Sequence, residues 1–165
     1  MKNIKKINAL QNYILNFIFT DGSEILFDMK PFLKYGLYSS IRDEINFQQV
    51  KFDGDHIYWN KVADIHLNTI LQEGIKVPEI SRFYGLIISL YFKDTDFHHR
   101  PHIHVRYGDN KASFAIDDGE LLAGSLPLKQ TKLIQTWIIL RQNELLEDWE
   151  LIQEGKDYFT IAPLR

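Results

Sequence analysis

A long helical pattern follows a series of short strand-like segments, and this order constrains the fold more than any other feature. From Leu128 to Glu154, apolar residues recur at helical spacing on one side: Ile134, Ile138, Leu145, Trp149 and Ile152. Further residues widen this apolar stripe: Leu133, Trp137, Leu140 and Leu151. Such a wide stripe is typical of a helix that lies across a β-sheet. Either Ser125 or Pro127 begins the helix, and Gly155 ends it.

The sequence before this helix contains a strand pair whose two faces differ. Residues 102–107 alternate between a polar face (His102, His104, Arg106) and an apolar face (Ile103, Val105, Tyr107). A two-residue turn at Asp109-Asn110 opposes apolar residues: Tyr107 with Ala112, Val105 with Phe114 and Ile103 with Ile116. The same register pairs His102 with Asp117. We therefore expect the helix on the Ile103 and Val105 face and the histidines on the opposite face. Strands at 85–92 and 159–162 complete the second half.

The first half begins with another strand pair, at residues 13–20 and 24–29, joined by the turn Asp21-Gly22-Ser23. A three-residue loop opposes apolar residues on one face: Phe19 with Ile25, Phe17 with Phe27 and Leu15 with Met29. A further strand pair flanks Asp53-Gly54, with Phe47, Val50 and Phe52 before it and Ile57, Tyr58 and Trp59 after it. The run from Asp64 to Leu71 predicts a short helix.

A break between the halves lies at residues 72–78, where Gly74 can end a helix and Pro78 disfavours helix at Val77. We therefore predict an α+β protein of two small domains, at residues 1–74 and 75–165. Each domain is expected to be an antiparallel sheet packed by helix, the second with one long helix.

Composition excludes several function classes. The chain of 165 residues is 45% hydrophobic and has no cysteine, so it can bury a core, whereas disulfides, thiolate zinc sites and cysteine nucleophiles are excluded. The net charge of −3 gives no broad electrostatic drive for binding nucleic acid, although local basic contacts remain open. No run of 18 apolar residues is present, so we expect a soluble, cytoplasmic protein without a membrane span.

Histidines concentrate between His98 and His104, where four of the six in the chain lie. Imidazole titrates near neutral pH and binds transition metals. One hypothesis is a divalent metal or acid–base site built from His99, His102, His104 and Asp117. A second is that these imidazoles line a polar sheet face and hydrogen-bond to carboxylates and backbone, and we favour it because thiolate ligands are absent. A third is that the polar face, with Arg106, Tyr91 and Lys93, contacts phosphate or a protein partner.

The motifs of the second half resemble the domain of unknown function 4160. The matching residues are Pro78-Glu79-Ile80, Phe83-Tyr84-Gly85, residues 99–105 from His99 to Val105, Tyr107-Gly108, Ala115-Ile116, Gly119, Gly124-Ser125-Leu126-Pro127, Trp137, Glu144-Leu145 and Trp149. Family members often carry histidine where this chain has Arg141. Arg141 instead indicates anion binding or an ion pair with a nearby carboxylate.

The first half is similar to the domain of unknown function 2442. The matching residues are Phe17, Asp21-Gly22, Phe27-Asp28, Pro31-Phe32-Leu33, Phe47, Val50, Ile57, Trp59 and Ala63-Asp64-Ile65. Both resemblances imply small bacterial proteins associated with toxin–antitoxin loci or mobile elements, here fused in one chain.

These observations lead to two hypotheses of function. We favour a non-enzymatic binding or regulatory module without a cofactor, which acts on a protein partner or as a homo-oligomer. The alternative is a small metal-dependent hydrolase or nuclease that uses the His98–His104 cluster. The candidate polar site comprises His99, His102, His104, Arg106, Asp117 and Arg141.

Overall fold

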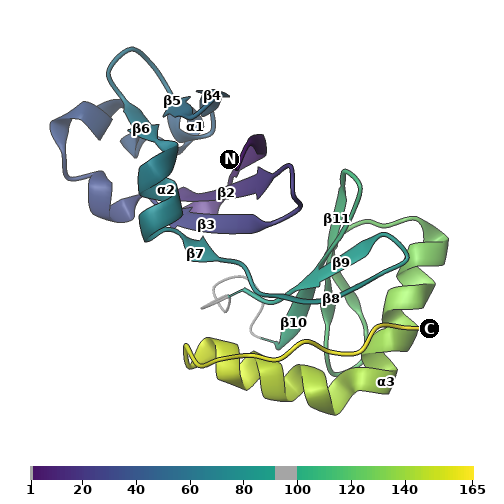
Figure 1. The fold of residues 1–165 in the computed structure, drawn as a ribbon. Helices are drawn as coiled ribbons and strands as arrows, with labels where there is room; N and C mark the ends of the chain where they lie inside the picture. The colour runs from purple at the N-terminus through teal and green to yellow at the C-terminus, as the bar shows by residue number, and fades with distance from the viewer. Residues whose placement is uncertain (1, 92–99) are drawn as a thin grey trace. The chain divides into compact units, whose positions relative to one another are not determined.

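The computed structural model describes residues 2–91 and 100–165 (Figure 1). The chain forms two compact units, Met1–Val77 and Pro78–Arg165. Both combine antiparallel strands with helices, so the predicted α+β class is confirmed. The sequence placed residues 75–77 in the second domain, whereas the structure joins them to the first unit, because residues 75 and 76 pair with a strand of its sheet.

The N-terminal unit contains two sheets. The four-stranded sheet has the order β1-β2-β3-β7, formed by β1 (Ile4–Ala9), β2 (Ile14–Phe19), β3 (Glu24–Asp28) and β7 (Ile75–Lys76). The three-stranded sheet is formed by β4 (Lys51–Asp53), β5 (His56–Tyr58) and β6 (Asp64–His66). Helical segments connect them: η1 (Gln11–Tyr13), η2 (Lys30–Phe32), η3 (Gly36–Arg42), α1 (Glu44–Phe47) and α2 (Leu67–Glu73). Phe17, Phe27, Phe47 and Ile57 belong to one buried core.

Several details of the first half differ from the prediction. The β2–β3 loop does contain three residues, but it lies one position earlier, because the backbone amide of Phe19 bonds to the carbonyl of Ser23. Phe17 therefore pairs with Ile25 and Leu15 with Phe27, so the apolar face is kept although each predicted partner shifts by two. Phe47 lies in α1 rather than in a strand, and the predicted helix from Asp64 begins as β6.

The C-terminal unit is one five-stranded sheet covered by a single long helix (Figure 1). Its order, β12-β11-β10-β9-β8, follows the sequence from one edge to the other. The strands are β8 (Glu79–Phe83), β9 (Leu86–Ser89), β10 (His102–Tyr107), β11 (Asn110–Ala115) and β12 (Leu121–Gly124). The helix, α3 (Leu128–Gln153), matches the predicted 128–154 and follows Pro127 as its N-cap.

The core of this unit lies between α3 and one face of the sheet. Ile103 and Val105 of β10 pack with Ile134, Ile138 and Leu145 of α3, so the predicted apolar face is confirmed. Arg141 departs from helical geometry, with φ −118° and ψ 15°. Figure 1 shows that α3 bends around the sheet, which lets both halves of the helix contribute to the core.

The register of the β10–β11 hairpin differs from the predicted one. The turn lies at Gly108-Asp109 instead of Asp109-Asn110, since Tyr107 pairs with Asn110. Gly108 supplies the positive φ of 57° that a tight turn requires. Each predicted partner is therefore displaced by two residues, which keeps the faces but pairs His102 with Ala115 rather than with Asp117.

The edge of the sheet at β8 was not anticipated. The sequence predicted one strand over 85–92, whereas Tyr84 and Gly85, with φ of 46° and 78°, form the turn between β8 and β9. No strand forms over 159–162, although the backbone amide of Ile161 donates to the carbonyl of Ile80 on β8 at 2.7 Å.

Candidate functional site

The candidate site lies at the start of β10, on the sheet face opposite Ile103. His102 is fully buried, and its Nδ1–H donates a hydrogen bond to the carbonyl of Arg100 at 2.8 Å. The ring lies 5.3 Å from that of Trp149 on α3 and 5.0 Å from that of His104. Because the carbonyl can only accept, this bond places a proton on Nδ1. The bond thus fixes the orientation of the His102 ring.

His104 continues the row of rings along the same face. Its ring stacks on Tyr91 at 3.9 Å with an interplanar angle of 11°, and its Nδ1 lies 3.2 Å from the hydroxyl of Ser113 on β11. Tyr91, His104, His102 and Trp149 therefore form a continuous row of ring contacts, stacked for the first pair and edge-on or tilted for the others, which we call the histidine stack. Ring contacts of this kind each contribute about 0.5–1.5 kcal/mol beyond the area they bury.

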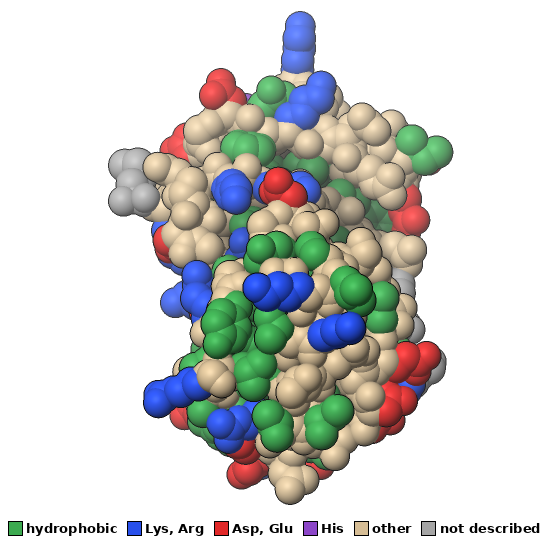
Figure 2. Space-filling model, turned by 90° about the vertical axis from the view of Figure 1, so that its right-hand side faces the viewer, with side chains coloured by type: hydrophobic (Ala, Val, Ile, Leu, Met, Phe, Trp, Pro, Cys, Tyr) green, Lys and Arg blue, Asp and Glu red, His purple; other side chains and the backbone are tan. Residues whose placement is uncertain are grey.

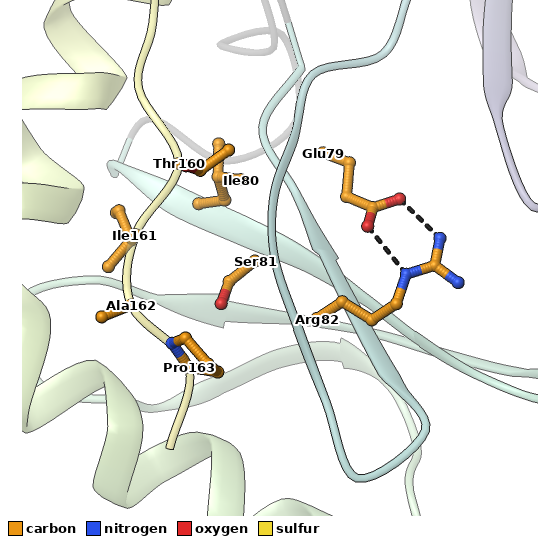
Figure 3. A pocket seen from close by; sticks show the side chains of 8 residues that line it. All are labelled: Glu79, Ile80, Ser81, Arg82, Thr160, Ile161, Ala162 and Pro163. Carbon is orange, nitrogen blue, oxygen red and sulfur yellow. Dashed lines mark hydrogen bonds and ion pairs between the residues drawn. The ribbon is translucent and has the colours of Figure 1, made fainter. Parts of the chain in front are cut away.

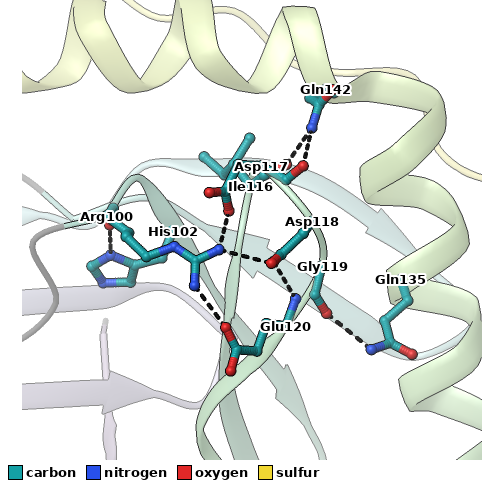
Figure 4. A network of polar contacts seen from close by, with 9 residues as sticks. All are labelled: Arg100, His102, Ile116, Asp117, Asp118, Gly119, Glu120, Gln135 and Gln142. Atoms are coloured by element: carbon teal, nitrogen blue, oxygen red, sulfur yellow. Dashed lines mark hydrogen bonds and ion pairs between the residues drawn. The ribbon is translucent and has the colours of Figure 1, made fainter.

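A cluster of charges surrounds Arg100, directly before β10 (Figure 4). The guanidinium contacts three carboxylates: Asp117 at 2.5 Å, Asp118 at 3.0 Å and Glu120 at 2.6 Å. These neighbours raise the pKa of Arg100, whereas the backbone amide of Glu120 and the Arg100 guanidinium lower the pKa of Asp118. Arg100 therefore ties the start of β10 to the β11–β12 connection.

Two glutamines of α3 hold the same connection from the helix side (Figure 4). The side-chain amide of Gln142 donates to the carbonyls of Ile116 and Asp117 at 3.0 and 2.6 Å, and that of Gln135 donates to the carbonyl of Gly119 at 2.9 Å. The connection is thus clamped between Arg100 and α3, and Asp117 is part of this clamp. Sequence reasoning did not anticipate the role of these glutamines, because uncharged helix residues carry no distinctive signal.

The structure brings only some of the predicted site residues together. His102 and His104 are neighbours, while Asp117 pairs with Arg100 and Arg141 pairs with Glu144 on its own helix at 3.1 Å. His98, His99 and Lys93 lie outside the described residues, so the predicted contribution of His99 stays a prediction. Arg106 follows on the same strand and is half-buried. Within residues 2–91 and 100–165, no group of three or more histidine and acidic side chains is placed to hold a metal ion.

The carboxyl of Asp148 was missed by sequence reasoning. It lies in α3 beside Trp149 and is fully buried, with Oδ1 accepting a hydrogen bond from the amide of Phe159 at 3.0 Å. Its Oδ2 has no hydrogen-bond partner among the described residues. Burial raises the pKa of Asp148, and the nearby charges of Glu147 and Glu144 act in the same direction. The carboxyl thus anchors the segment after α3 at an energetic penalty to its charged form.

A cavity of about 390 Å³ lies between β8 and the C-terminal segment (Figure 3). Figure 3 shows Ser81 between the two, while Arg82 and Glu79 join through two bonds of 2.8 and 2.7 Å on the outer side. The hydroxyl of Ser81 is buried without a hydrogen-bond partner among the described residues. Because Glu79 engages Arg82 in this bidentate pair, the cavity offers little charge to a ligand.

Comparisons with known proteins match these two units. A family described as a domain of unknown function (DUF4160) matches residues 85–150, and one described as a protein of unknown function (DUF2442) matches residues 4–76. The chain is a fusion of a DUF2442 domain and a DUF4160 domain. This confirms the resemblance seen in the sequence. No curated protein and no solved structure matches the chain.

All four residues of the histidine stack lie within the DUF4160 match, and none of them lies within the DUF2442 match. Arg100, the three carboxylates that it contacts and both clamping glutamines also lie within residues 85–150. No helix in the described parts of the chain combines the length and the apolar character needed to cross a bilayer.

Proposed function

We propose that this protein is a non-enzymatic binding or regulatory module of a bacterial toxin–antitoxin or mobile-element locus, which acts on a protein partner in the cytoplasm. The observation that carries this proposal is that polar residues of the candidate site make their contacts within the fold. His102 is buried within the histidine stack. Arg100 and Asp117 form an ion pair that holds the β11–β12 connection in place. General acid–base catalysis instead needs a group that a substrate can reach.

The association with toxin–antitoxin loci rests on the two families to which the domains belong. A fusion of two domains whose families occur near one another suggests that the domains act together. The net charge of −3 favours a protein partner over nucleic acid.

The test is to express this chain and the product of a short adjacent reading frame, separately and together, in a bacterial host. We expect one product alone to arrest growth, the pair to grow normally, and the two proteins to copurify as a complex of defined stoichiometry. Normal growth in every case, together with no complex between the purified proteins, would refute the proposal.

A specific observation favours a metal-dependent hydrolase or nuclease as a second candidate. In metal sites, a ligating histidine commonly donates its other ring N–H to a backbone carbonyl, and His102 does so toward Arg100. This candidate uses His99, His102, His104 and Asp117 as ligands. Against it, His102 is fully buried and Asp117 is engaged by Arg100.

Metal analysis separates these two candidates. The metal-dependent candidate predicts stoichiometric zinc, manganese or nickel in the purified protein, lost in the double variant His102→Ala/His104→Ala. It also predicts that zinc titrated into chelator-treated protein perturbs the histidine resonances in an NMR spectrum. If those resonances do not move, the metal-dependent candidate is excluded.

A further inference from the structure

The outward face of α3 carries a continuous exposed stripe along the whole helix. We call this stripe the outer ridge, and its exposed members are Lys129, Lys132, Thr136, Ile139, Leu140, Asn143, Glu147 and Glu150. Spacings of three and four residues keep them on one side of a helix. Ile139 and Leu140, at 69% and 63% exposure, stand at its middle, so Leu140 faces outward and not toward the sheet as the sequence predicted. Figure 2, viewed from the side of Figure 1 on which α3 begins, shows hydrophobic side chains interspersed with Lys and Arg in the lower part of the view.

The charges of the outer ridge are separated along its length. Lys129 and Lys132 lie in the first part of α3, and Glu147 and Glu150 lie in the last part. This order opposes the helix dipole, which favours acidic groups near the first turn and basic groups near the last. Neither terminal turn of α3 carries the favourable charge. The distribution therefore weakens the isolated helix, and stability of the helix does not account for it.

The ridge charges are also not used within the described parts of the chain. No ion pair there involves Lys129, Lys132, Glu147 or Glu150. Glu147 adds to the charge that raises the pKa of the buried Asp148. A neighbouring cation would relieve this unfavourable interaction.

We propose that the outer ridge is a self-association surface, on which α3 of a second copy of this chain lies antiparallel. An axis of two-fold symmetry between Ile139 and Leu140 brings these apolar residues together at the centre. The same axis places Lys132 of each copy opposite position 147 of the other, and Lys129 opposite position 150. Every ridge charge then meets its opposite in an isologous contact. The antiparallel order also aligns the two helix dipoles favourably.

The bend of α3 limits the extent of this contact. Because the helix bends around its sheet at Arg141, the outer ridge is convex, and two copies meet mainly near the axis. Lys132 and Glu147 lie about 11 Å along the helix from the axis. Long side chains at that distance can still reach each other. The dimer is therefore small, reversible and sensitive to salt. It is separate from the partner binding proposed above, so either proposal can fail alone.

Charge reversal in the full chain tests the proposal, with the association constant measured by sedimentation velocity over a concentration series at low salt. K132E and E147K each place like charges opposite one another at two symmetric positions. Each variant is expected to weaken association at least about tenfold. The double variant K132E/E147K is expected to recover it, because both charges are exchanged. A mixture of the two single variants is expected to form heterodimers although neither forms homodimers.

K61E is the matched control for K132E, because Lys61 is exposed in the other unit and its reversal makes the same change in net charge as K132E. Far-ultraviolet circular dichroism checks that each variant is folded. Three results would overturn the proposal: a chain that stays monomeric at its highest soluble concentration, a dimer as sensitive to K61E as to K132E, or a double variant that does not recover. Binding of an acidic protein to a monomeric chain would assign the ridge to that partner instead.

Discussion

Replacement of His102 by alanine distinguishes a structural histidine from a catalytic one. The side chain is fully buried, bonds to the carbonyl of Arg100 at 2.8 Å and contacts the rings of Trp149 and His104. The hydrogen bond contributes about 1 kcal/mol and each ring contact about 0.5–1.5 kcal/mol. We therefore expect H102A to lower the free energy of unfolding of the C-terminal unit by about 2–4 kcal/mol, including the cavity that it leaves.

Hydrogen exchange followed by mass spectrometry measures this loss unit by unit. Peptides from β10, β11 and α3 should exchange faster in H102A, while those from the N-terminal unit should not change. His66→Ala is the control, because His66 is exposed in the N-terminal unit and its loss should cost less than about 1 kcal/mol. If H102A lowers the stability of its unit by less than about 0.5 kcal/mol, the histidine stack does not hold the fold.

Other variants test the buried carboxyl of Asp148 and the close approach of Gly124 to β11. Because burial raises the pKa of Asp148, its charged form destabilises the folded state, and wild-type stability should fall as pH rises from its unfolded pKa through its raised folded pKa. D148N removes this penalty, so its stability relative to wild type in urea unfolding should increase as the pH rises above the ordinary pKa of an aspartate carboxyl, about 3.9. A stability difference that does not change with pH would contradict the assignment. A Cβ at Gly124, where φ is 74°, would lie 2.1 Å from the carbonyl oxygen of Lys111. G124A should therefore cost at least about 3 kcal/mol of thermal stability, whereas G54A, at φ 62° with open space, should cost about 1 kcal/mol, and equal losses would refute the argument from the close approach.

The long helix and the faces of the strands could be predicted because both follow from periodicity. The apolar stripe of α3 and the alternation of His102 and Ile103 each depend only on which residues share a face. Strand register could not be predicted in the same way, because a shift of two residues leaves every side chain on its face. Apolar pairing is then satisfied in both registers, and the turn geometry at Gly108 decides between them.

The candidate site was predictable only in part. The adjacency of His102 and His104 follows from their spacing on one strand. The contact of His102 with Trp149 depends on the bend of α3, which the sequence did not indicate. The register found in the structure also places Asp117 away from His102, and its carboxylate pairs with Arg100 instead. Buried Asp148 lay among several helix acids and had no distinguishing pattern.

The order of strands has a consequence for how the two units fold. In the C-terminal sheet every strand pairs with its neighbour in sequence, and the longest connection between paired strands is the 12 residues between β9 and β10. In the N-terminal unit Ile25 pairs with Lys76, and this contact encloses the three-stranded sheet and both α-helices. Closing about 50 residues costs roughly 3.5 kcal/mol of chain entropy before native contacts offset it. We therefore expect β7 to dock late in folding and to detach first, which makes the junction between the units the earliest point of local unfolding.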